Sequence, residues 1–193
     1  FFIDSPWKAR MDISNGALGE GLSHDLDKAR YLTREEFLTV ISRITPVTIK
    51  QDGDFFVDGG RSMHLAQLSG GILAQFCLSI TAGEDRFSWF IVGDEGSLRI
   101  PDSGTVVVRQ RHDDDEPVEL EIASADKVMP STHLQQHTWN RLIEDFIGAV
   151  RNDDKDHGSY PSLPTLNDGF RTEEVIDAAR RSSSTGRWAT VGG

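Results

Sequence analysis

The sequence has 193 residues, of which 20 are Lys or Arg and 31 are Asp or Glu, so its formal net charge is −11. This acidic balance disfavours binding to nucleic acid or to an anionic membrane surface, because both present negative charge to the protein. No apolar run approaches the ~20 residues that a membrane-spanning helix needs, and we expect no membrane partner.

The first residues, Phe1 to Asp4, contain neither an initiating Met nor the basic and apolar segments of a secretory signal. We therefore expect the sequence to be a piece of a longer or processed chain. Its one cysteine, Cys77, cannot form an internal disulfide, which favours a reducing, cytoplasmic location. We interpret Cys77 as a small buried hydrophobic residue rather than a nucleophile, because no base lies near it in the sequence.

The first predicted helix covers about residues 17–32, where apolar side chains recur at helical spacing. Ser14 or Asn15 is expected to cap its N-terminus, because either side chain can accept hydrogen bonds from free N–H groups of a first turn. Gly19 and Gly21 destabilise these first turns, which indicates that the backbone there approaches another group closely.

From Glu36 to Asp126 the hydrophobic pattern has a period of two residues, which predicts strands with one buried face. Turn signals separate the runs at Asp52-Gly53, Gly59-Gly60, Gly70-Gly71, Gly83-Glu84-Asp85, Gly93-Asp94 and Ser103-Gly104. Because the connections are short, we expect successive strands to pair antiparallel.

Two helices follow, one over about residues 132–151 with an apolar stripe and one that begins near Asn167-Asp168-Gly169. A short strand is expected within residues 186–191. This order predicts an α+β fold with one open, mostly antiparallel sheet and helices packed on one face. The other face carries an apolar set that is often covered by a second subunit, namely Leu73, Phe90, Val92 and Val107.

Glu20, His24 and Asp27 are spaced i, i+4 and i+7, which places them on one face of the first predicted helix. A carboxylate beside an imidazole can orient the ring and raise its proton affinity, which suits acid–base chemistry or a polar ligand. The same spacing occurs on an ordinary solvated helix face, so both interpretations stay open here.

Other candidate sites have simpler explanations. Trp7, Lys8 and Arg10 combine an aromatic ring with two cations and suit an anionic or sugar-like ligand, or equally an ordinary surface strand. His133 and His137 lack third and fourth metal ligands, and the acidic run at residues 113–116 lacks the glycine and spacing of a calcium loop. We predict no metal site. The sequence also contains no G-x-G-x-x-G dinucleotide fingerprint and no phosphate-binding loop.

Three segments carry a family resemblance. Residues 16–27, GALGEGLSHDLD, resemble a segment of the form G-G-x-L-x-D-x-G-x-H-x-x-D. Residues 90–98 resemble an I-x-G-x-x-G-x-L turn, and residues 167–188 resemble a closing D-G helix with a small-residue stop. All three are similar to segments of the glucose–fructose oxidoreductase, inositol dehydrogenase and rhizopine catabolism family, Gfo/Idh/MocA.

The resemblance implies that residues 1–193 form a single substrate-binding and oligomerisation domain, like the C-terminal domain of dihydrodipicolinate reductase. It implies an NAD(P)-dependent oxidoreductase that acts on a sugar, polyol or cyclitol CH–OH group. NAD or NADP would be bound mainly by an N-terminal Rossmann domain, which is absent from this sequence along with the family's E-K-P lysine. The open sheet face would form a homodimer or homotetramer.

The resemblance also assigns roles. His24 matches the family's catalytic histidine and is expected to act as general acid or base. Glu20 stands in place of the family's aspartate and is expected to share the catalytic role by positioning the substrate hydroxyl or His24. Asp27 matches the last acid of the segment and is expected to contribute to substrate binding. Leu22 stands where the family has glycine. These two departures, at Glu20 and Leu22, motivate a second hypothesis, in which the chain is a non-catalytic regulatory or assembly module. A third is a free-standing ligand-binding domain without a Rossmann segment.

Overall fold

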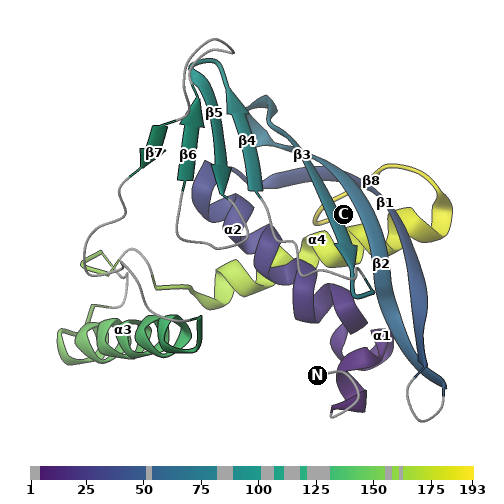
Figure 1. The fold of residues 1–193 in the computed structure, drawn as a ribbon, viewed down its shortest axis with the longest axis horizontal. Coiled ribbons are helices and arrows are strands. Elements are labelled where there is room, and N and C mark those ends of the chain that lie inside the picture. The colour runs from purple at the N-terminus through teal and green to yellow at the C-terminus, as the bar shows by residue number, and fades with distance from the viewer. Residues whose placement is uncertain are drawn as a thin grey trace. The chain divides into compact units, whose positions relative to one another are not determined.

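The computed structural model describes residues 5–50, 54–81, 89–100, 107–110, 118–120, 131–154, 158–160 and 163–193. The chain divides into two compact units (Figure 1). The first unit contains Phe1–Thr81 and Pro164–Gly193, and the second contains Ala82–Leu163. The described helices are too short or too polar to span a lipid bilayer.

The first unit begins with short helices, a 3-10 helix at Pro6–Ala9 and α1 at Met11–Ser14. A π-helical turn at Leu18–Leu22 leads directly into α2 at Ser23–Thr33. The helix predicted over about residues 17–32 is therefore confirmed, although its first turn is π-helical rather than α-helical. Leu18, Leu22 and Leu26 are fully buried, as the helical spacing predicts.

The predicted N-cap of this helix is wrong. Asn15 has a left-handed backbone, with φ of 61°, and ends α1 instead of starting the next helix. The Ser14 hydroxyl donates backwards to the carbonyl oxygen of Lys8 at 2.9 Å. No side chain caps the π-helical turn, whose N-cap position is Ala17.

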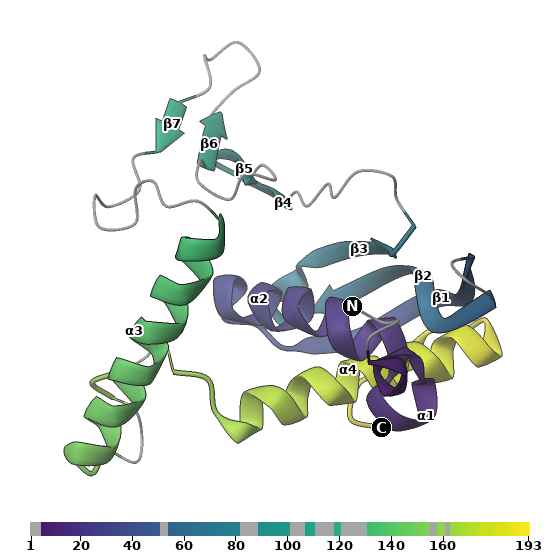
Figure 2. The same cartoon turned by 60° about the horizontal axis from the view of Figure 1, so that its bottom comes forward.

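The sheet of the first unit has the order β3-β2-β1-β8, and all its neighbouring strands are antiparallel. Its strands are β1 at Phe37–Lys50, β2 at Asp54–Leu68, β3 at Leu73–Ser79 and β8 at Ala189–Thr190. Helix α4 at Leu166–Thr185 packs along β1, where Ser182 Oγ accepts a hydrogen bond from the Ser42 N–H at 3.0 Å. Figure 2 shows α2 beside α4.

Alternation along β2 separates the two faces of this sheet. One set of side chains is buried, namely Ser62, His64, Ala66 and Leu68, and the intervening set is exposed, namely Arg61, Met63, Leu65 and Gln67. Leu73 on β3 is 79% exposed and adds to the open face. Cys77 on the same strand is also exposed, so the prediction that it is buried is wrong. Its strand position points it to the open face, opposite Met63.

Gly59-Gly60 is not the predicted turn, because both residues lie inside β2. The register between β1 and β2 shifts between Thr45 and Val47, where β2 contains the additional residues of a bulge. Gly59 has φ of +68°, and a Cβ at Gly60 would lie 2.9 Å from the Val47 Cβ. Both glycines therefore allow the bulge and the close strand contact.

The second unit contains β4 at Trp89–Gly93, β5 at Gly96–Ile100, β6 at Val107–Gln110 and β7 at Val118–Leu120, which form an antiparallel sheet in this order. It also contains α3 at Ser131–Arg151, which confirms the predicted helix. The turn at Gly93-Asp94 is confirmed between β4 and β5.

The predicted α+β class is confirmed, but the described strands form two four-stranded sheets instead of one. Leu73 therefore lies in a different sheet from Phe90 and Val92, although all three are exposed as the sequence suggests. Several features lie outside the described residues: the turn signals at 52–53, 83–85 and 103–104, the acidic run at 113–116, and the side chains of Val107, His133 and His137.

Candidate functional site

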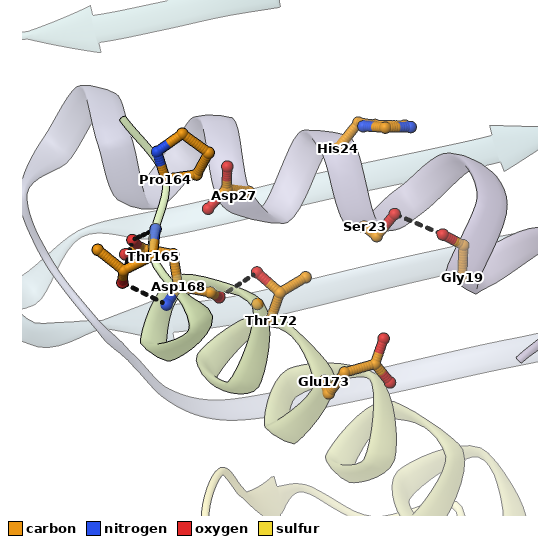
Figure 3. Close-up of a pocket in the computed structure, with 10 residues that line it drawn as sticks. Gly19, Ser23, His24, Asp27, Pro164, Thr165, Asp168, Thr172 and Glu173 are labelled. Atoms are coloured by element: carbon orange, nitrogen blue, oxygen red, sulfur yellow. Dashed lines mark hydrogen bonds between the residues drawn. The ribbon is translucent and has the colours of Figure 1, made fainter. Parts of the chain in front are cut away.

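A cleft of about 300 Å³ opens between α2 and the first half of α4 in the first unit (Figure 3). Its walls come from two segments far apart in the sequence. The lining residues are Gly19, Ser23, His24, Asp27, Pro164, Thr165, Asp168, Gly169, Thr172 and Glu173.

The α2 wall carries His24 and Asp27, which are three residues apart and therefore share a helix face. His24 is exposed and Asp27 is partly buried. Ser23 is fixed by its own backbone, because its hydroxyl donates to the Gly19 carbonyl oxygen at 2.5 Å. The His24 imidazole is thus a solvent-accessible acid–base group on the same wall of the cleft as the Asp27 carboxylate.

The α4 wall begins with a capping box. Thr165 Oγ1 accepts from the Asp168 N–H at 3.2 Å, and Asp168 Oδ2 accepts from the Thr165 N–H at 2.8 Å and from its hydroxyl at 2.7 Å. These hydrogen bonds, together with the nearby Arg30 guanidinium, lower the pKa of Asp168. Asp168 is therefore a carboxylate at neutral pH.

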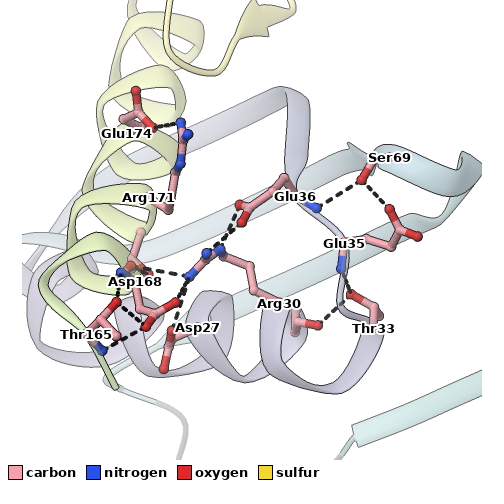
Figure 4. A network of polar contacts seen from close by, with 12 residues as sticks. Asp27, Arg30, Thr33, Glu35, Glu36, Ser69, Thr165, Asp168, Arg171 and Glu174 are labelled. Atoms are coloured by element: carbon pink, nitrogen blue, oxygen red, sulfur yellow. Dashed lines mark hydrogen bonds and ion pairs between the residues drawn. The ribbon is translucent and has the colours of Figure 1, made fainter. Parts of the chain in front are cut away.

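Arg30 contacts residues of both walls (Figure 4). Its guanidinium is 8% exposed and donates to both oxygens of Glu36 at 2.7 and 2.8 Å. It also reaches Asp168 Oδ1 at 3.4 Å and Asp27 Oδ1 at 3.5 Å. The same contacts lower the pKa of Glu36. The bidentate pair joins α2 to the segment before β1, and the longer contacts with Asp168 join α2 to α4 at the cleft.

Sequence reasoning missed Arg30 and Asp168 as parts of this site. The T-x-x-D spacing of Thr165 and Asp168 before an apolar run was an available capping signal. Nothing local indicates the contact of Arg30 with Asp168, because 138 residues separate them.

Glu20 belongs to a neighbouring cluster and does not line this cleft. It sits in the π-helical turn, where Glu20 Oε2 forms an ion pair with Lys8 Nζ at 3.0 Å. Both side chains are about one fifth exposed, at 19% and 23%. The structure thus pairs Glu20 with Lys8, whereas His24 and Asp27 line the cleft.

The remaining predicted residues lie near Lys8 or at the surface. Trp7 is 51% exposed, and Lys8 Nζ lies 5.4 Å from the centroid of its ring. Arg10 forms an ion pair with Asp12 at 2.6 Å, which lowers the pKa of that carboxyl. Trp7, Lys8 and Glu20 therefore form one cluster, and Arg10 is engaged separately.

The described side chains include no group of three His, Cys, Asp or Glu residues placed to share a metal ion.

The fold and the site define a class of protein: an α+β domain with antiparallel sheets and a cleft that contains a histidine. Residues 4–191 match the family model described as the oxidoreductase family, C-terminal alpha/beta domain. The chain therefore belongs to the Gfo/Idh/MocA oxidoreductase family, as the sequence resemblance predicts. No curated protein sequence matches the chain significantly.

Solved structures share the fold at low sequence identity. An oxidoreductase domain protein from Kribbella flavida has a TM-score of 0.71 at 19% identity, with 97% of this chain and 54% of that chain covered. Levoglucosan dehydrogenase in complex with NADH and levoglucosan has a TM-score of 0.75 at 18% identity, with 97% and 53% covered. An NAD binding oxidoreductase from Klebsiella pneumoniae has a TM-score of 0.70 at 16% identity, with 100% and 56% covered. The chain thus spans about half the length of each of these structures.

Proposed function

We propose that residues 1–193 are the substrate-binding and oligomerisation domain of an NAD(P)-dependent oxidoreductase that acts on a sugar, polyol or cyclitol CH–OH group. The observation that carries this proposal is that His24 and Asp27, both part of the family segment, line the same cleft. Levoglucosan dehydrogenase, which has the same fold and was solved with NADH and a sugar, supports the class of substrate.

His24 is the proposed acid–base group. Oxidation of a CH–OH carbon requires that the hydroxyl oxygen lose its proton, and an exposed imidazole is suited to accept it. Asp27, three residues away, is a proposed acceptor for a second substrate hydroxyl. Trp7, Lys8 and Arg10 remain predicted substrate contacts at the edge of the domain.

Glu20 has a proposed positioning role. Its ion pair with Lys8 holds the π-helical turn from which α2 begins, and His24 lies in the first turn of that helix. A π-helical turn at this point is itself a frequent mark of functional sites.

The sequence contains no G-x-G-x-x-G fingerprint for a dinucleotide. We therefore propose that NAD or NADP binds mainly to an N-terminal Rossmann domain outside this sequence. We also propose a cytoplasmic location, supported by the single cysteine.

The test is turnover by the full-length protein with a panel of sugars and cyclitols and with both coenzymes. His24→Ala is expected to lower kcat by about 10²–10⁴-fold, the usual contribution of a general acid–base group. Asp177→Asn, an exposed change on α4 outside the cleft, is the control and should retain activity. Unchanged turnover in His24→Ala would contradict the assigned role.

A second candidate is a non-catalytic regulatory or assembly module. Two observations favour it. Leu22, at the position where the family has glycine, is buried with 2% exposure. The Glu20 carboxylate already forms an ion pair with Lys8. Calorimetry of the full-length protein with NAD, NADP and the sugar panel separates the two candidates. Coenzyme binding with turnover of any sugar eliminates the regulatory module.

A further inference from the structure

Negatively charged side chains predominate over positively charged ones in the lining of the cleft between α2 and α4. Three of them are carboxylates, Asp27, Asp168 and Glu173, whereas none of the ten lining residues is Lys or Arg. We infer that this cleft selects uncharged polyhydroxy compounds over sugars that carry a phosphate or carboxylate group. This inference rests on the proposed function of the cleft and specifies its class of substrate.

The buried Arg30 does not offset these charges. Arg30 is 8% exposed, and both oxygens of Glu36 already accept hydrogen bonds from its guanidinium. Its remaining contacts go to Asp27 and Asp168. Arg171 also acts on Glu36, but it forms its own ion pair with Glu174 at 2.9 Å. Two cations thus face four carboxylates, Asp27, Glu36, Asp168 and Glu174, so this network as a whole is negative.

Glu173 adds a further negative charge, which its neutral hydrogen-bond partner does not neutralise. Its Oε2 accepts from the neutral Asn15 amide at 2.8 Å. Arg180 reaches the same Asn15 side chain, donating to its Oδ1 at 2.9 Å. Glu173 is exposed at the cleft, so its carboxylate faces any ligand that enters.

Carboxylates distinguish the two classes of ligand by simple electrostatics. Sugar hydroxyls donate hydrogen bonds to carboxylate oxygens, and such bonds to a charged acceptor are stronger than neutral ones. Repulsion between a dianionic phosphate and a carboxylate about 6 Å away lowers the affinity of the phosphate ester roughly tenfold, even at the dielectric constant of bulk water. The wall therefore accepts a neutral polyol and rejects its phosphate ester.

The experiment compares matched pairs on the full-length protein by calorimetry in low salt. The probes are glucose against glucose 6-phosphate, and inositol against inositol 1-phosphate. We expect the neutral member of each pair to bind at least tenfold more tightly. The difference should shrink at high salt, because the Debye length falls to about 3 Å at 1 M.

Two charge reversals on the same helix locate the effect. Glu173→Lys is expected to reduce the preference for the neutral member by about tenfold or more. Asp177→Lys is the matched control, since Asp177 lies one turn further along α4 but does not line the cleft. It should leave the preference unchanged. An equal shift in both variants would attribute the effect to the net charge of the protein and overturn the inference.

The outcomes also separate this inference from the proposed function. Turnover of a sugar phosphate as efficient as that of the neutral sugar overturns the charge selection and keeps the oxidoreductase. Absence of coenzyme binding together with absence of binding by both members of each pair overturns both.

Discussion

His64 shows how one buried polar residue sets a property of the fold. It lies in β2 with 2% of its surface exposed, and its Nδ1 shares a hydrogen bond with Ser42 Oγ at 2.8 Å. Among the described residues, its Nε2 has no hydrogen-bond partner, and neither does the buried Ser62 hydroxyl. Burial lowers the pKa of His64 to about 4 from its ordinary 6.5.

This shift predicts a pH-dependent loss of stability. The unfolded chain binds a proton at His64 below about pH 6.5, whereas the folded chain binds it only near pH 4. The free energy of unfolding should therefore fall by about 3 kcal/mol as the pH drops from 6.5 to 4. Urea denaturation at pH 7, 5.5 and 4.5 measures it.

The control for this prediction is His64→Leu, which places an apolar side chain of similar size at this position. Leucine cannot titrate. Between pH 7 and 5, this variant should lose less stability than the natural sequence. Identical pH profiles for the two proteins would show that His64 is not responsible for the loss.

At the scale of elements, the π-helical turn depends on one close backbone approach. A Cβ at Gly19 would lie 1.9 Å from the Ser14 carbonyl oxygen, a distance that only movement of the backbone can relieve. By contrast, a Cβ at Gly169 in α4 would meet no atom within 4 Å. Two glycines that border the same cleft are thus under different constraints.

We therefore predict opposite effects of the same substitution. Gly19→Ala should lower the free energy of unfolding by about 2 kcal/mol or more, because overpacking forces a backbone shift. Gly169→Ala should be neutral or stabilise by up to about 1 kcal/mol, because alanine is the better helix former. Chemical denaturation of both variants measures the free energy of unfolding. If Gly19→Ala unfolds with the same free energy as the unsubstituted protein, the described turn is contradicted.

For the whole molecule, the open face of the first sheet bears on assembly. Met63 is 60% exposed, Leu65 is 49% exposed and Leu73 is 79% exposed on adjacent strands. An exposed sheet face that carries large apolar side chains is commonly covered by a partner. We propose that a second copy of the protein covers this face.

The proposed assembly predicts that Leu65→Glu weakens self-association of the full-length protein, since it places a charge in an apolar interface. Light scattering coupled to gel filtration should detect a smaller species. Tyr31→Glu, which changes an exposed aromatic residue on α2, should leave the mass unchanged. An unaltered mass for Leu65→Glu would show that the copies do not meet through this face.

Local periodicity and motif spacing were enough to predict several elements and one residue of the cleft. The spacing of leucines predicted α2, alternation predicted strands with one exposed face, and the family segment singled out His24. These features depend on residues within one or two turns of each other, so the pattern carries the information directly.

Contacts between residues far apart in the sequence are seen only in the folded chain. The tertiary structure paired Glu20 with Lys8 across 12 residues and Arg30 with Asp168 across 138 residues, and it turned Gly59-Gly60 into a bulge inside β2. It also exposed Cys77, because β3 is an edge strand whose alternate residues face the open side. Contacts of this kind follow from the path of the chain in space, which no local pattern encodes.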